Sequence, residues 1–158
     1  MIIRAARSIE IKTLAALGEL AWEQALENSG ENTQNYIKGA QATYFHFCSE
    51  NWPIISVIEV DGEVLGWGAV DPNKNNITDI WVLPDFQRQG LGSLLLTELE
   101  KQISERGFET IELETHAKNT NAISFFKKHG FVVSSLKSSY VAKLDKTVDT
   151  IEMRKTFE

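Results

Sequence analysis

The sequence contains few of the residues that hold a small fold together covalently or through metals. Cys48 is the only cysteine in 158 residues, so no internal disulfide can form. No group of cysteine and histidine residues has the spacing of a zinc site. We therefore expect neither disulfides nor a bound metal, and a fold held by its hydrophobic core alone.

Long apolar runs are also missing from the sequence. No run approaches the roughly 20 residues that a helix needs to span a bilayer. The start, MIIRAARSIEIK, has charges where a signal peptide needs a long apolar stretch. We expect a cytoplasmic protein without a membrane partner.

The third deficit is in positive charge. The net charge is −6, and residues 1–75 carry 5 Lys and Arg against 10 Asp and Glu, whereas residues 76–158 carry 11 against 12. Binding to nucleic acid needs stripes of Lys and Arg to neutralise phosphates, so a nucleic-acid partner is disfavoured. An acidic half would suit a cationic partner such as an amine, although acids of this kind also serve only to keep a protein soluble.

The length and the uniform composition of the chain indicate one domain over residues 1–158. The apolar fraction of 42% and the charged fraction of 24% are ordinary for a globular protein. Neither repeats nor low-complexity tracts nor linkers rich in proline, glycine or serine interrupt it. A chain of this size is long enough to close a single core.

Hydrophobic periodicity predicts the elements of the first half. Ile2–Ala5 reads as a short strand, Ser8 as the N-cap of a helix that ends near Gly30, and Thr33 as the cap of a second helix. The second helix would place these residues on one side: Tyr36, Ile37, Ala40, Tyr44, Phe47 and Cys48. Two strands, Ile54–Val60 and Glu63–Val70, are then joined at Asp61-Gly62, which is a strong hairpin signal because both residues tolerate positive φ.

The second half alternates strands and helices. Ile77–Leu83 completes a three-stranded meander and stops at Pro84, and a helix follows from Leu91 to Gly107. The remaining predicted elements are a strand at Thr110–Thr115, a helix at Asn121–His129, a strand at Phe131–Ser135 and a last strand at Val148–Phe157. The fold class is α+β, with a mixed, mostly antiparallel sheet flanked by helices.

The segment Ile80–Ser93, IWVLPDFQRQGLGS, holds the clearest functional signal. It predicts a strand, a short turn and a glycine-containing loop that opens an amphipathic helix. Backbone N–H groups converge at such a helix start, and the helix dipole favours an anion there, so the loop suits a pyrophosphate. It lacks the Gly-Lys-Ser/Thr ending of a nucleotide P-loop, and Leu95 stands where a dinucleotide fingerprint has its third glycine. An ordinary tight turn is the competing interpretation.

Two motifs in this region resemble those of the GNAT superfamily of acyl-CoA-dependent N-acetyltransferases. The segment Ile80-x-Val82-x-Pro84 followed by Gln87-x-x-Gly90-x-Gly92 resembles its acyl-CoA signature, and Asn119-x-x-Ala122-x-x-Phe125-Phe126-x-x-x-Gly130-Phe131 is similar to its downstream block. Over residues 76–133 the resemblance extends to the branch that acetylates protein N-termini, such as ribosomal-protein alanine acetyltransferases. It implies a GNAT-like fold, with acetyl-CoA as co-substrate and a primary amine of a small molecule, peptide or protein as acceptor. A homodimer would follow by analogy with the family only.

The resemblance also assigns roles by position. It implies that the backbone of Ile80, Trp81 and Val82 pairs with the pantetheine arm, while Asn119 and Phe126 lie near the thiol. The pyrophosphate would be held by the loop and first helical turn, namely Gln87, Arg88, Gln89, Gly90, Leu91, Gly92 and Ser93. The acceptor site would come from the divergent half, around Glu19, Trp22, Glu23 and Tyr44.

Acetyl transfer needs a neutral amine, and most alkyl amines are protonated at neutral pH, so a base is expected. Glu114 stands where the N-terminal acetyltransferase branch has its catalytic glutamate, but it also reads as a surface carboxylate paired with Lys118. Asp79 is the reserve candidate, and His116 lies close by with a side chain suited to acid–base work. A backbone N–H near Val82 would stabilise the oxyanion.

Phe126 is the main departure from the family pattern. The family often has tyrosine there to protonate the leaving thiolate, and phenylalanine cannot donate a proton. Tyr140 could substitute, the thiolate could leave unaided, or catalysis could be lost. The alternative function is therefore a non-catalytic acyl-CoA-binding module of the same fold.

Overall fold

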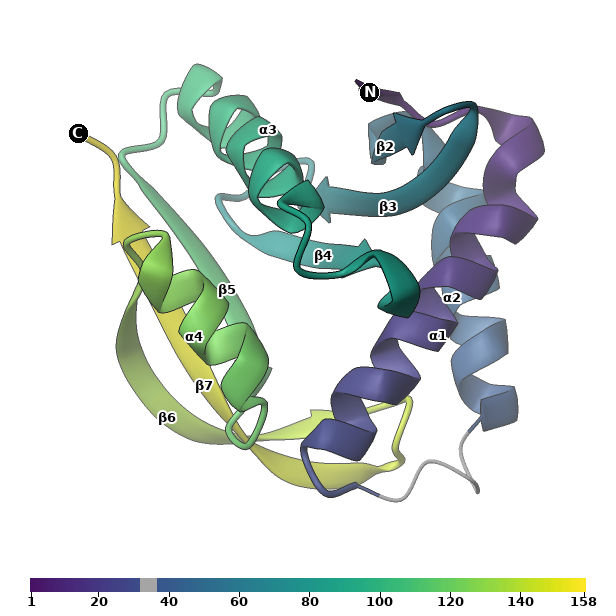
Figure 1. Ribbon diagram of the computed structural model, residues 1–158. Helices are drawn as coiled ribbons and strands as arrows, with labels where there is room; N and C mark the ends of the chain where they lie inside the picture. Colours follow the sequence, from purple (N-terminus) through teal and green to yellow (C-terminus); the bar gives the residue numbers. More distant parts are fainter. Residues whose placement is uncertain (32–36) are drawn as a thin grey trace.

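The computed structural model describes residues 1–31 and 37–158 (Figure 1). The elements follow in the predicted order: β1 (Ile2–Ala5), α1 (Ile11–Asn28), α2 (Ile37–Asn51), β2 (Ser56–Val60), β3 (Glu63–Val70), β4 (Ile77–Val82), α3 (Leu91–Glu105), β5 (Thr110–His116), α4 (Thr120–Lys128), β6 (Val132–Val141) and β7 (Lys146–Thr156). Short 3-10 turns lie at Ser8–Glu10, Trp52–Ile54 and Pro84–Phe86. In the part of the chain that the structure describes, no helix is long and apolar enough to cross a membrane.

The strands form two antiparallel sheets, ordered β1-β2-β3-β4 and β5-β7-β6. The predicted hairpin is confirmed, because Asp61 and Gly62 both have positive φ, at 50° and 83°. The two sheets meet where β4 and β5 run parallel, at a single bridge between Asn76 and Glu112. This parallel contact makes the arrangement mixed, and the α+β fold class is confirmed.

Helices cover the sheets on both faces. Helices α1 and α2 pack on one face of the first sheet, where Leu14, Tyr44 and Trp67 share a core, and α3 packs on the other face through Leu95 against Ile58. The indole N–H of Trp67 donates to the carbonyl of Leu14 over 2.8 Å, which satisfies its one polar atom inside that core. Helix α4 packs on the second sheet, on the same side of the molecule as α3 (Figure 1).

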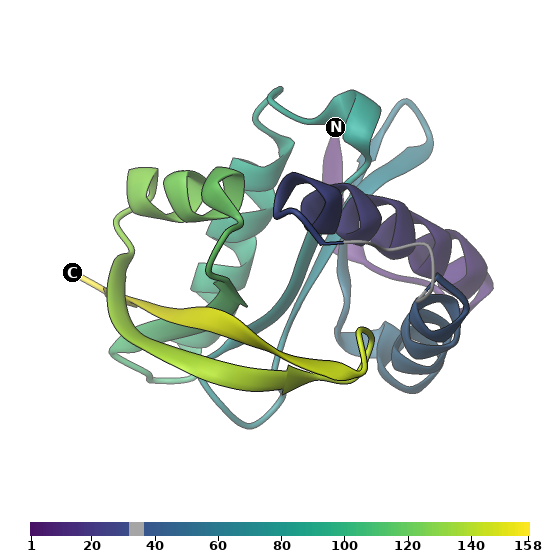
Figure 2. The same ribbon diagram turned by 90° about the horizontal axis from the view of Figure 1, so that it is seen from below.

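The C-terminal hairpin is longer than the sequence predicts. β6 continues past Ser135 to Val141, and β7 begins at Lys146 rather than Val148. Most of β6 is exposed on both faces, so its pattern lacks the alternation that identifies a half-buried strand. The turn of this hairpin reaches α2 (Figure 2), and Leu144 within the turn is fully buried in the core below α1 and α2.

Two local predictions differ from the structure, and a third is not tested by it. Ser8 caps no helix, because it opens the 3-10 turn, and the carboxylate of Glu10 accepts the N–H of Arg7 instead. Ile54 lies in a second 3-10 turn that contains Pro53, so strand β2 starts two residues later. The predicted cap Thr33 and the aromatic Tyr36 lie outside the described residues.

Candidate functional site

A cleft of about 590 Å³ opens where the two sheets separate. Beyond the bridge at Asn76, strands β4 and β5 diverge (Figure 1). The residues that line the cleft come from β4, the start of α3, α4 and one face of α1. Among the residues for which the sequence predicts a site, these line it: Ile80, Trp81, Val82, Gln87, Arg88, Gly90, Gly92, Ser93, Asn119 and Phe126. Residues far apart in the chain are thus brought to one cavity.

Strand β4 presents backbone groups to this cleft. The N–H of Leu83 donates to the carbonyl of Leu65 on β3 over 2.9 Å, and the register places Ile80 opposite Gly68 and Val82 opposite Gly66. Because hydrogen-bonded and non-hydrogen-bonded pairs alternate in an antiparallel ladder, the N–H and C=O groups of Ile80 and Val82 point away from β3. The carbonyl of Val82 accepts the side-chain amide of Gln87 over 2.9 Å, which fixes the loop to the strand edge.

The loop after β4 turns the start of α3 toward the cleft. Gly90 is the N-cap of α3 at φ 86°, and Arg88 is also left-handed at φ 63°. The first intrahelical bond of this turn runs from the N–H of Leu94 to the carbonyl of Gly90, so the three N–H groups before Leu94 lie at the free end of the helix. A helix start of this kind attracts anions.

Two predicted loop residues do not line the cleft. The side chain of Gln89 is exposed, and that of Leu91 is buried with Ile58 and Leu95 in the core under α3. For Leu91 only the backbone N–H, at the helix start, is placed to serve an anion.

Helix α4 supplies a second wall. Asn119 is its N-cap, and its Oδ1 accepts the N–H of Ala122 over 3.2 Å, so the other half of the amide, Nδ2, remains to serve a ligand. Phe126 is buried and packs edge-on against Phe125 and Phe131. Its ring therefore gives the cleft an apolar surface and no proton donor.

Several lining residues are not among those that the sequence predicts. His129 lies 3.0 Å from the hydroxyl of Ser93 and against the ring of Phe125, and thereby ties α4 to the start of α3. Helix α1 contributes one face, namely Ala21, Gln24, Ala25 and Asn28. Their spacing of three and four residues was visible in the sequence, but it is the same spacing that marks a core face.

Glu114 is on the surface of the second sheet and does not line the cleft. Its carboxylate accepts the hydroxyl of Thr150 over 2.7 Å and pairs with Lys137 at 3.3 Å, not with Lys118. Burial acts to raise the pKa of Glu114, but hydrogen bonds from Thr150 and Ser139 and the Lys137 ion pair outweigh it, and the pKa is lowered.

Asp79 is half-buried on the same face of β4 as Trp81, and it does not itself line the cleft. The indole N–H of Trp81, which lines the cleft, donates to Asp79 Oδ1 over 3.0 Å. Burial raises the pKa of Asp79, although that hydrogen bond and the nearby Lys143 ammonium oppose the shift. A raised pKa brings a carboxylate closer to the range of an effective base.

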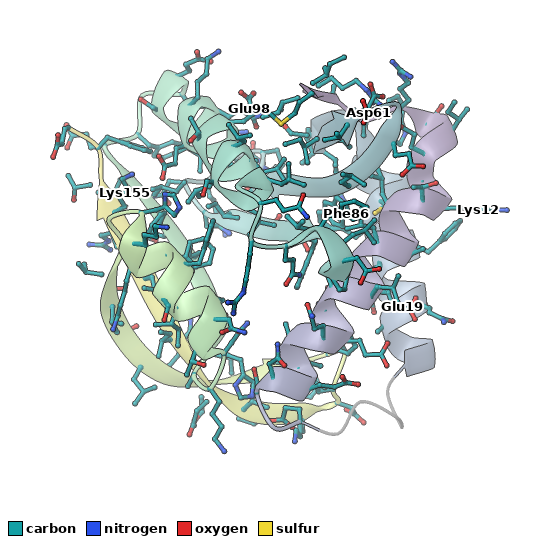
Figure 3. All side chains as sticks on the ribbon, in the orientation of Figure 1. Lys12, Glu19, Asp61, Phe86, Glu98 and Lys155 are labelled. Carbon is teal, nitrogen blue, oxygen red and sulfur yellow. The ribbon has the colours of Figure 1, made fainter. Side chains whose placement is uncertain are left out.

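The remaining candidates for proton transfer also lie outside the cleft. His116 binds Glu31 at 3.0 Å, and the exposed Tyr140 donates to Asp145 over 2.6 Å. Tyr140 is therefore not placed to serve as the proton donor that Phe126 cannot be. Glu19 faces α2, where Gln41 donates to it over 2.9 Å (Figure 3).

Comparison with known proteins agrees with this architecture. The model of the Acetyltransferase (GNAT) family matches residues 14–131. The [ribosomal protein bS18]-alanine N-acetyltransferase of Escherichia coli (strain K12) is 39% identical over 81 residues, which are 51% of this chain and 55% of that protein. An uncharacterized N-acetyltransferase of Methanocaldococcus jannaschii is 33% identical over 84 residues, 48% of this chain and 37% of that protein. The matched region thus spans about half the length of the bS18-specific relative.

Solved structures extend the likeness to the whole fold. The PaiA N-acetyltransferase of Thermoplasma acidophilum, in complex with coenzyme A, has a TM-score of 0.78 at 20% identity and covers 99% of this chain and 98% of its own. A GCN5-related N-acetyltransferase of Rhodopseudomonas palustris has a TM-score of 0.81 at 17% identity, over 99% and 95% of the two chains. With the family model matching most of its length, this chain belongs to the GNAT acetyltransferase family.

Proposed function

We propose that the protein transfers the acetyl group of acetyl-CoA to a primary amine. The observation that supports this most directly is the cleft, where the free edge of β4 and the start of α3 meet. An extended amide-containing arm can hydrogen-bond to the outward N–H and C=O groups of Ile80, whereas the carbonyl of Val82 accepts Gln87 and its N–H is left for another role. A pyrophosphate fits the helix start from Arg88 to Ser93, because both the N–H groups and the helix dipole favour an anion there.

The bound co-substrate would supply a thioester, whose acetyl carbon is activated for attack by an amine. The N–H of Val82 points into the cleft and is proposed to stabilise the oxyanion of the tetrahedral intermediate. Its rigid place in a paired strand supports this role, because a donor that is fixed before reaction costs no reorganisation.

One of two carboxylates is proposed to remove the amine proton, and the contacts and burial of Asp79 favour it. Asp79 contacts Trp81, a wall of the cleft, and its pKa is raised by burial. Glu114, the position that matches the catalytic glutamate of the N-terminal acetyltransferase branch, is ionised more readily and held by Lys137, so it is the weaker base.

A binding module without turnover is the second candidate, and the observation that favours it is Phe126. Release of free CoA thiol from acetyl-CoA, followed with a panel of amines, separates the two functions when paired with calorimetry of acetyl-CoA binding. Thiol release that depends on an amine supports the enzyme. Binding without release would support the module, and a folded protein that binds no acetyl-CoA would contradict both.

Membership of the acetyltransferase family indicates neither where the protein is located nor how it assembles. A cytoplasmic location and a homodimer stay predictions of the sequence and of the family resemblance. The bS18-specific relative makes the N-terminus of a ribosomal protein one acceptor to include in the panel.

A further inference from the structure

A histidine lies on the wall of the cleft where α4 and α3 meet. His129 is the C-cap of α4, and its Nε2 lies 3.0 Å from the hydroxyl oxygen of Ser93 in the first turn of α3. The ring of Phe125 packs against the imidazole, with 4.7 Å between the ring centroids, and restrains its orientation. All three residues line the cleft. The imidazole is therefore held at the end of α3 where free N–H groups attract an anion.

The charged side chains that line the cleft are cations, although the protein as a whole has a net charge of −6. Among the described residues of this lining, Arg88 and Lys128 are positively charged, and neither aspartate nor glutamate is present. Lys127 lies beside Lys128 in the last turn of α4. An anion is therefore the ligand that this lining favours.

The other charges around His129 belong to an ion pair. Lys155 on β7 passes beside Gly130, where an added Cβ would lie 3.3 Å from Lys155 Cε. Its ammonium group pairs with Glu100 on α3 at 3.1 Å. Glu100 is thus engaged by another cation, while the C-terminal end of α4 favours positive charge at its cap.

The protonation state of His129 affects the hydroxyl of Ser93. The Nε2 atom of a neutral imidazole either donates to that oxygen or accepts from it, whereas a protonated imidazole can only donate. Donation to Oγ leaves the hydroxyl hydrogen for a different acceptor, and the N–H groups of the same helical turn place an anion within its reach. Protonation of His129 thus adds both a positive charge and an oriented O–H donor to the anion site.

We propose that His129, acting through the hydroxyl of Ser93, is a positioning residue for the pyrophosphate of acetyl-CoA, and that co-substrate binding takes up a proton at this imidazole. The inference rests on the proposed acetyl transfer and adds to it a dependence of co-substrate affinity on pH. A bound anion stabilises the imidazolium, so the complex holds more protons than the free protein. Affinity therefore falls as the pH rises through the range in which histidine loses its charge.

The chain offers a matched control for this histidine. It has three histidines, at positions 46, 116 and 129, and all three lie in the described part of the sequence. His46 is exposed on α2, and His116 binds Glu31 at 3.0 Å. Neither lines the cleft, so His46→Gln removes an imidazole without touching the anion site.

One hydrogen bond that gains a charge should change affinity about tenfold. By linkage, a tenfold preference for the protonated form corresponds to the uptake of about half a proton at most, midway through the transition. Calorimetric titrations in buffers with different ionisation enthalpies measure this number directly. They use acetyl-dephospho-CoA beside acetyl-CoA, because the former keeps the pyrophosphate and lacks the phosphate monoester, which itself titrates near about pH 6.

Wild type and His46→Gln should both take up about half a proton on binding acetyl-dephospho-CoA, and both should bind it up to about tenfold more weakly at pH 8 than at pH 6. In His129→Gln the uptake should vanish and the affinity should become independent of pH. Its affinity should match wild type at pH 8 and be lower at pH 6. Ser93→Ala, which removes the hydroxyl and keeps a good helix former, should also lose the uptake.

Turnover gives a second readout. With saturating amine, the KM for acetyl-CoA should rise with pH in wild type more steeply than in His129→Gln, whereas kcat should be the same in both. A histidine that only packed against Phe125 would alter stability and leave these pH profiles parallel.

Failure of this inference and failure of the proposed function look different. Proton uptake that is absent in wild type with acetyl-dephospho-CoA, or that persists in folded His129→Gln or Ser93→Ala, would overturn the role of this pair and leave acetyl transfer standing. Absence of acetyl-CoA binding in folded wild type at every pH would instead overturn the proposed function.

Discussion

Gly92→Val should separate co-substrate binding from folding. A Cβ at Gly92 would lie 3.4 Å from Phe125 and 4.0 Å from Val82, which are ordinary contact distances, so the first carbon fits. The two methyl groups of valine would then occupy the cleft in front of the N–H groups of the first turn of α3. We expect acetyl-CoA affinity to fall more than tenfold, a loss beyond about 1.4 kcal/mol.

The stability of the Gly92→Val protein should not fall together with its affinity for acetyl-CoA. Glycine inside a helix costs about 1 kcal/mol relative to alanine, and valine recovers part of this, so the free energy of unfolding should be unchanged or slightly higher. Gly90→Ala is the matched comparison, and we expect it to lower the free energy of unfolding. Nothing lies within 4 Å of a Cβ there, but φ is 86°, so the substitution strains the backbone by about 1–2 kcal/mol.

The assays are calorimetric titration with acetyl-CoA and urea unfolding of both variants. Gly90→Ala should unfold at lower urea and melt several degrees earlier, at roughly 2–4 °C per kcal/mol for a chain of this size. A folded Gly92→Val protein with wild-type affinity for acetyl-CoA would refute the assignment of the cleft, whatever the stability of Gly90→Ala.

The remaining predictions concern the removal of the amine proton, the buried charge of Lys143 and the apolar wall at Phe126. Asp79→Asn should lower the rate of thiol release by about 10²–10⁴ without affecting acetyl-CoA binding, and Glu114→Gln by much less; the reverse order would give the base to Glu114. Because burial lowers the pKa of Lys143 to about 8 from an ordinary 10.5, the folded state loses this proton first, so the free energy of unfolding rises with pH between these values. Relative to Lys143→Met, wild type should gain up to about 1.4 kcal/mol per pH unit in that window by urea titration, and a pH-independent difference would contradict the burial of the charge. Phe126→Tyr should leave turnover unchanged or slightly lower, since the ring packs in an apolar cluster; faster thiol release would show that thiolate protonation limits the native protein.

Local sequence determined much of the co-substrate half. The strand at Ile80–Val82 and the glycines at 90 and 92 can each be predicted from a short stretch of sequence, because backbone conformation depends on neighbours in the chain. The Asp61-Gly62 hairpin belongs to the same class. The order of the elements followed from periodicity alone, and it needed no knowledge of how the sheets meet.

Only the tertiary structure decided which of these residues share a cavity and in which direction their pKa values shift. Asp79 and Glu114 look alike in sequence, yet burial raises the pKa of one while hydrogen bonds and Lys137 lower that of the other. In the sequence, Lys143 is a charged loop residue. In the structure, its ammonium group lies near the rings of Trp22, Tyr44 and Trp81, which come about 60 to 120 positions earlier in the chain. Desolvation and ring contacts depend on packing between distant segments, and no local pattern records them.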